Sequence, residues 1–155
     1  MKLVQIFLMG LIACFALPSV AQTASDMQIL ADKVRADKKL VVAANMQLTD
    51  AEAKAFWPVY DAYQADLQKL NQRLGTLIKN YATEYNKGAV SDETAKKLVN
   101  EMLSVEEAEV KLKRSYVPRL EKAIPGAKVA RYMQVENKIR AVIKYELAAN
   151  IPLVK

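Results

Sequence analysis

Three glutamates close together in the sequence are the residues best placed to do chemistry. Glu106, Glu107 and Glu109 form the densest acidic cluster of the chain, and grouped carboxylates are ligands for hard cations such as Ca²⁺. However, Glu107 and Glu109 each have a lysine four positions on, Lys111 and Lys113. This is the spacing of ion pairs on an exposed helix face. The pattern therefore favours a solvated helix face over a cation site.

Other reactive side chains are scarce. The chain of 155 residues has no histidine and a single cysteine, Cys14. Histidine and cysteine supply most general bases, nucleophiles and transition-metal ligands, so a hydrolase or other enzyme is disfavoured. Met27, Met46, Met102 and Met133 are scattered, which is typical of core packing rather than of a metal site. We expect no catalytic residue, no metal site and no cofactor.

Basic side chains gather in two stretches. The chain has 23 lysines and arginines against 17 acidic residues, a net charge of +6. The basic residues of the two stretches are Lys33, Arg35, Lys38 and Lys39, and Lys128, Arg131, Lys138, Arg140 and Lys144. A positive surface with apolar spots attracts a client polypeptide by charge and then retains it by apolar contact. Plain solubility explains the charges equally well, and a membrane-surface helix is a third interpretation, although Glu136 and Glu146 interrupt the second stretch.

Aromatic side chains are concentrated just before and after a proline. Phe56, Tyr60 and Tyr63 follow helical spacing and are predicted to lie in the core. Trp57 lies off that line, beside Pro58. Because tryptophan is enriched where proteins contact partners, Trp57 is the aromatic residue that we expect to do so.

The first 21 residues have the pattern of a secretory signal peptide. Lys2 precedes an apolar run, Leu3–Leu17, and small residues lead to a cleavage site after Ala21. The run is too short to span a membrane, and lipid attachment at Cys14 is less favoured because the following residues stay apolar. We expect an exported, periplasmic protein, residues 22–155, forming one domain with no integral membrane span. In the periplasm, acidic polypeptides, lipid headgroups and cell-wall polymers are its accessible partners, rather than nucleic acid.

The elements that position these side chains are predicted to be four helices in the order short, long, long, short, an all-α fold. Their links are short, so consecutive helices should be antiparallel neighbours. The predicted helices run from a cap at Ser25 or Asp26 to about Ala44, from Asp50 to about Asn86, from a cap at Ser91 onward, and from the "IPG" at residues 124–126 to Pro152.

The two central helices carry one apolar line each, as in a coiled coil. The lines are Ala53, Phe56, Tyr60, Tyr63, Leu67, Leu70, Leu74, Leu77 and Tyr81, and Ala95, Leu98, Met102, Val105, Leu112 and Tyr116. Glu109 interrupts the second line, and Gln64 and Asn71 narrow the first at its centre. Two long helices cannot bury such a line alone, so we expect a second copy to cover it in a homodimer.

Two prolines fall inside these long helices. Thr49 and Glu52 predict a capping box that starts the second helix, so Pro58 lies well inside it and should bend it. Pro58 and Pro118 are each 30 residues from Gly88, the predicted turn. In an antiparallel hairpin they would lie side by side and bend both helices at one level. The alternative is that each proline only marks a helix end.

These features together resemble the Spy/CpxP type of periplasmic helical protein, which is known for an LTxxQ motif. Leu48 and Thr49 match the motif in "LTDAE", whereas Ala53 occupies the place of the glutamine and Glu52 stands one place before it. At the expected second copy, "IPGAK" at residues 124–128 keeps only the apolar residue and a helix start. The resemblance implies a dimeric cradle that holds unfolded clients, damps envelope-stress signalling or senses metals.

The leading hypothesis is an exported homodimer that binds unfolded or acidic envelope polypeptides without ATP, and is not an enzyme. The alternatives are a regulatory or sensor module that docks on one envelope protein, and a metal-responsive periplasmic protein. The residues that we expect to contact clients or partners are Trp57, Arg131, Lys138, Arg140 and Lys144.

Overall fold

The computed structural model describes residues 37–154. The chain divides into two compact units, residues 1–41 and 42–155, and the second contains the hydrophobic core. The predicted signal peptide, its cleavage site after Ala21 and the start of the first helix lie outside the described residues.

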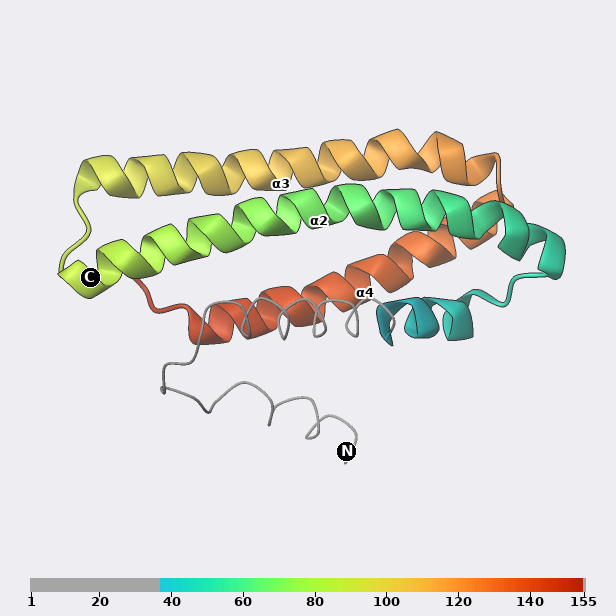
Figure 1. The fold of residues 1–155 in the computed structure, drawn as a ribbon, viewed down its shortest axis with the longest axis horizontal. Helices are drawn as coiled ribbons and strands as arrows, with labels where there is room; N and C mark the ends of the chain where they lie inside the picture. The colour runs from blue at the N-terminus through green and yellow to red at the C-terminus, as the bar shows by residue number, and fades with distance from the viewer. Residues whose placement is uncertain (1–36, 155) are drawn as a thin grey trace, which may run out of the picture. The chain divides into compact units, whose positions relative to one another are not determined.

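Residues 37–154 form helices joined by short links, with no strand among them. Residues 37–46 are helical, and three longer helices follow: α2 (Asp50–Lys87), α3 (Asp92–Glu121) and α4 (Gly126–Asn150) (Figure 1). The all-α prediction is confirmed, and the starts of α2 and α3 are those expected. α4 also has the predicted range, and its 25 residues make it shorter than α2 with 38 and α3 with 30, as expected.

The start of α2 is fixed by the predicted capping box. The Thr49 backbone N–H donates to Glu52 Oε2 at 2.8 Å, and the Glu52 N–H donates to Thr49 Oγ1 at 3.3 Å. Lys128 Nζ also donates to Glu52 Oε2, which ties the first turn of α4 to the first turn of α2. The bond from Lys128 and that from the Thr49 N–H lower the pKa of Glu52. The "LTDAE" segment therefore has a structural role here.

The prolines affect the two long helices differently. α2 continues for more than seven turns beyond Pro58, so the interpretation that this proline ends a helix is wrong. α2 follows an arched path (Figure 1). Pro118 lies in the last turn of α3, which ends at Glu121. A bend shared by both helices at one level stays a prediction.

α2 and α3 run antiparallel and side by side (Figure 1). The rings of Tyr63 and Tyr116 are 5.3 Å apart, and Arg73 pairs with Glu101 at 2.9 Å, so residue numbers rise along one helix as they fall along the other. The turn between them uses Gly88 at a φ of 128°, a conformation that favours glycine. α4 then lies against this pair of helices, as the contacts of Gln64 with Tyr132 and Glu136 show.

The core lies at the end of the pair where α2 begins and α3 ends. Its buried residues are Val42, Met46, Phe56, Tyr60, Tyr63, Leu67, Tyr116, Leu120, Ile124, Val129 and Tyr132. Tyr132 of α4 makes edge contacts with the rings of Phe56, Tyr60 and Tyr63, at 5.1, 5.9 and 6.2 Å. The predicted burial of those three aromatic residues is confirmed. Burial is less complete toward Gly88, where Leu77 and Val105 are buried but Leu70 and Leu74 are only half-buried and Met102 is 43% exposed.

Candidate functional site

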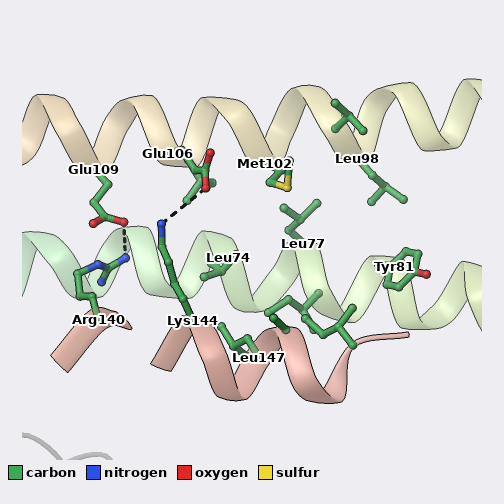
Figure 2. Close-up of a pocket in the computed structure, with 15 residues that line it drawn as sticks. Leu74, Leu77, Tyr81, Leu98, Met102, Glu106, Glu109, Arg140, Lys144 and Leu147 are labelled. Atoms are coloured by element: carbon green, nitrogen blue, oxygen red, sulfur yellow. Dashed lines mark hydrogen bonds and ion pairs between the residues drawn. The ribbon is translucent and has the colours of Figure 1, made fainter. Parts of the chain in front are cut away.

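A groove opens between α2, α3 and α4 where the apolar lines are left uncovered (Figure 2). Its volume is about 430 Å³, within the range of small-molecule sites, roughly 300–1,000 Å³. The apolar residues that line it are Leu74, Leu77, Ile78 and Tyr81 of α2, Leu98, Val99, Met102 and Val105 of α3, Leu147 and Ala148 of α4, and Ile151. Residues of the two predicted apolar lines therefore also line this groove.

Charged side chains gather at one end of the groove (Figure 2). Glu109 of α3 is paired with Arg140 of α4 and, at 2.8 Å, with Lys113. Glu106 and Lys144 form a second pair at 3.6 Å. The first pair is enclosed, since Glu109 is 7% exposed and the Arg140 side chain 12% exposed. The second pair is open to solvent on both sides.

The predicted solvated face of α3 is wrong at Glu109. The expected pair with Lys113 is present, but Glu109 lies on the buried face, because its place in the apolar line turns it toward α4. Glu107 and Lys111 form no ion pair in the described structure. No group of three or more potential Asp, Glu or Cys metal ligands occurs within residues 37–154.

Electrostatics keep Glu109 ionised. Burial raises the pKa of Glu109, but hydrogen bonds from Lys113 and Arg140 outweigh it, so the pKa is lowered overall. Arg140 also donates from Nη1 to Asn71 at 3.4 Å. Its buried Nε has no acceptor within hydrogen-bonding distance among the described residues.

A second buried carboxylate, Glu136, lies one turn before Arg140 and is fully buried. Gln64 Nε2 donates to Glu136 at 2.8 Å and to the Tyr132 hydroxyl at 3.2 Å. Burial, with the charge of Glu136, raises the pKa values of Tyr60, Tyr63 and Tyr132, so these phenols stay neutral. Sequence reasoning missed this network.

A signal for the network was present in the sequence. Gln64 and Asn71 are the polar positions that narrow the apolar line of α2, and each meets a charged residue of α4, Glu136 or Arg140. Polar residues that interrupt an apolar line are the expected hydrogen-bond partners of buried charges. Which charge each would meet depends on how α4 crosses α2.

The proposed contact residues separate into three locations. Arg131 and Lys138 are exposed on the side of α4 turned away from Glu136, together with Val142 and Tyr145; we call these four residues the outer face of α4. Arg131 also contacts the helix of residues 37–46, because its Nε donates to the Asn45 carbonyl oxygen. Lys144 lies at the rim of the groove. Arg140 is internal, so its expected place on a client-binding surface is wrong, because its guanidinium group is engaged by Glu109 and Asn71.

Trp57 is half-buried rather than fully presented to a partner. Its ring makes edge contacts with Phe56 at 5.0 Å and Tyr60 at 5.2 Å, and it packs against the core. These contacts give Trp57 a packing role, and partner contact by its remaining exposed part stays a prediction.

The groove is limited at its far end by the residues after α4. The Tyr81 hydroxyl donates to the Pro152 carbonyl oxygen at 2.8 Å, and Ile151 lines the groove. Leu153 projects into solvent. The groove therefore has a charged end near Arg140 and an apolar end near Ile151.

Comparison with known proteins gives no match to a family model, a curated protein or a solved structure. No helix within residues 37–154 combines the length and the apolar character needed to cross a membrane.

Proposed function

We propose that this protein is an exported, ATP-independent binder of unfolded or acidic polypeptides that acts as a homodimer. The observation that carries the proposal is the outer face of α4. Two large apolar side chains, Val142 and Tyr145, are 64% and 72% exposed there. The cation Lys138 lies on the same side of the helix, as does Arg131, whose Nε donates to the Asn45 carbonyl oxygen. Apolar groups beside like charges are what a low-specificity binder of acidic, partly unfolded chains needs.

Binding would proceed in two stages. Residues 22–155 hold 22 basic and 17 acidic residues, a net charge of +5, which attracts an acidic chain over several ångströms, and the encounter is weakened by salt. Val142 and Tyr145 then contact apolar side chains that the client exposes only when unfolded. Folding of the client buries those side chains and removes the contact, so release needs no nucleotide. Glu136 and Glu109 remain inside the bundle and do not repel the client.

The test is suppression of aggregation of an acidic model client, followed by light scattering at low salt. The wild-type protein should suppress scattering at several-fold excess, and about 0.5 M salt should weaken this, because the Debye length falls below about 5 Å. The variant Val142→Glu/Tyr145→Glu should lose suppression. Thr83→Glu/Asn100→Glu, which adds the same charge at exposed positions of α2 and α3, is the matched control. Unchanged scattering with wild-type protein would reject client holding.

The alternative of a regulatory module makes a different prediction with the same reagents. A protein that docks on one envelope protein should capture a single stoichiometric partner from envelope extract, whereas a client holder captures many. Val142→Glu/Tyr145→Glu should abolish capture in either case, which assigns the activity to the outer face.

A further inference from the structure

The methionines of the described chain differ in their access to solvent. Met46 is 1% exposed in the core, and Met133 of α4 is partly buried and packs against the core. Met102 of α3 is 43% exposed and lines the groove. An oxidant in solution must reach the sulfur atom of a methionine before it can form the sulfoxide. The fold therefore sets Met102 apart from Met46 and Met133.

The wall around Met102 is more enclosed than parts of Met102 itself. Leu77 and Val105, which line the same groove, are 9% and 6% exposed. Figure 2 shows Met102 on the side of α3 that turns toward Leu77 and the groove. The thioether is thus part of an apolar wall that solvent reaches while the three helices stay in place.

The oxidised product also suits the position of Met102. A methionine sulfoxide carries a polar oxygen, which is costly to bury without a hydrogen bond. At Met102 solvent can supply that bond. At Met46 the same oxygen would lie among the apolar side chains of the core, so oxidation there requires the core to open.

We propose that Met102 is a modification site for hydroperoxides, which convert it to methionine sulfoxide in the folded protein. The sulfur lone pair attacks the outer oxygen of the hydroperoxide, and the O–O bond breaks. The sulfur keeps that oxygen and is oxidised by two electrons, while the other oxygen leaves as water or an alcohol with the proton that the outer oxygen releases. The reaction puts a polar group into the apolar wall of the groove. It involves no residue of the outer face, so it stands apart from client binding.

Peptide mass spectrometry after mild treatment with hydrogen peroxide tests the proposal. Trypsin places each methionine of residues 22–155 in a peptide of its own: Met27 in 22–33, Met46 in 40–54, Met102 in 98–111 and Met133 in 132–138. In the folded protein Met102 should oxidise faster than Met133, and more than about tenfold faster than Met46, which reacts only when the core opens. Met102 reacting no faster than Met46 or Met133 would overturn the proposal.

The same measurement in denaturing guanidinium chloride separates fold from sequence. The rates of Met46, Met102 and Met133 should become similar there, because all three thioethers are then open to the oxidant. A preference for Met102 that persists in the denatured chain would show that the fold does not select this site, and would also overturn the proposal.

Moving the methionine along the groove wall tests whether exposure selects the site. In Met102→Leu, which keeps the wall apolar, residues 98–111 should gain no oxygen. Adding Val99→Met to this variant, at a position that is 50% exposed and lines the same groove, should restore fast oxidation. Adding Leu77→Met instead, at a position that is 9% exposed, should give only slow oxidation. Equal rates at positions 77 and 99 would contradict selection by exposure.

Circular dichroism tests whether the folded protein accepts the sulfoxide. Protein oxidised at Met102 should keep the helix content of the wild type, and Met46 should oxidise at the same rate in wild type and Met102→Leu. Faster oxidation of Met46 in wild type would show that the sulfoxide opens the core, against the proposal.

One comparison keeps this proposal separate from client holding. Val142→Glu/Tyr145→Glu should oxidise at Met102 at the wild-type rate, and Met102→Leu should suppress client aggregation as the wild type does. Failure of one proposal is thereby distinguishable from failure of the other.

Discussion

At the residue scale, two carboxylates of the described chain are buried in the bundle, Glu109 on α3 and Glu136 on α4. Desolvation of a charge costs several kcal/mol, and each carboxylate has a partner on another helix in addition to one on its own helix, Lys113 for Glu109 and Tyr132 for Glu136. Glu109 is met by Arg140 across the interface, and Glu136 by Gln64. These polar contacts fix how α4 lies against the other two helices.

Removing one member of the enclosed pair should therefore be costly. Arg140→Met leaves Glu109 with Lys113 alone and is expected to lower the free energy of unfolding by about 3 kcal/mol, measured by urea denaturation. Replacing both, as Glu109→Leu/Arg140→Met, should restore stability to within about 1 kcal/mol of wild type, because no buried charge is left unpaired. A double variant as unstable as the single one would contradict this account.

Two tyrosines give a matched pair for testing buried hydroxyls. The Tyr63 hydroxyl is buried with no hydrogen-bond partner among the described residues, so Tyr63→Phe should be neutral or stabilise by about 1 kcal/mol. The Tyr116 hydroxyl donates to Asp66 at 2.7 Å, so Tyr116→Phe should destabilise. The midpoint temperatures of thermal unfolding of the two variants are compared with that of the wild type. Equal effects would show that the Tyr63 hydroxyl has a partner.

The same groups set the pH range of stability. The folded pKa of Glu109 is lowered below its ordinary value of 4.5, so its contribution is present above about pH 4.5 and is lost as the pH falls further. The pKa values of Tyr60, Tyr63 and Tyr132 are raised above 10.0, so their contribution is lost as the pH rises beyond about 10. The midpoint temperature of thermal unfolding should thus be constant between about pH 4.5 and pH 10 and fall at lower and at higher pH. Glu109→Gln should make the decline on the acid side shallower and leave the alkaline side unchanged; Glu52 and Asp66, whose pKa values are also lowered, maintain the rest of the acid-side decline.

At the element scale, the Thr49–Glu52 capping box fixes the residue at which α2 begins. Thr49→Ala removes the side-chain half of the capping box and should lower stability by about 1 kcal/mol, whereas Thr49→Ser should retain it. Thr76→Ala, in the exposed interior of the same helix, should instead stabilise by a few tenths of a kcal/mol, because alanine has the higher helix propensity. Similar losses at Thr49 and Thr76 in thermal unfolding would contradict a specific cap.

At the scale of the whole molecule, the remaining apolar surface bears on assembly. Leu103 and Val110 are exposed on the side of α3 opposite Val105 and Tyr116, at about 100° of rotation per residue. If a second copy covers this side, residues 22–155 should have the mass of a dimer by multi-angle light scattering. Leu103→Lys/Val110→Lys should then give a monomer. A wild-type monomer at all concentrations would reject the homodimer.

The helices and their caps follow from local rules, which is why they could be predicted. The apolar spacing of α2, the Thr49–Glu52 cap and the turn at Gly88 each depend on residues within a few positions of one another. The burial of Phe56, Tyr60 and Tyr63 follows from the same spacing.

The sequence by itself thus determined the all-α class, the helix starts and the aromatic core, because hydrogen bonds and side-chain periodicity within a helix are local. Tertiary structure alone decided that Glu109 and Arg140 face each other, that Lys144 stands at a rim and that the apolar lines part into a groove. Residues 31 positions apart meet only through the angle at which α4 crosses its neighbours. That angle is set by the packing of many side chains at once, and no single stretch of sequence encodes it.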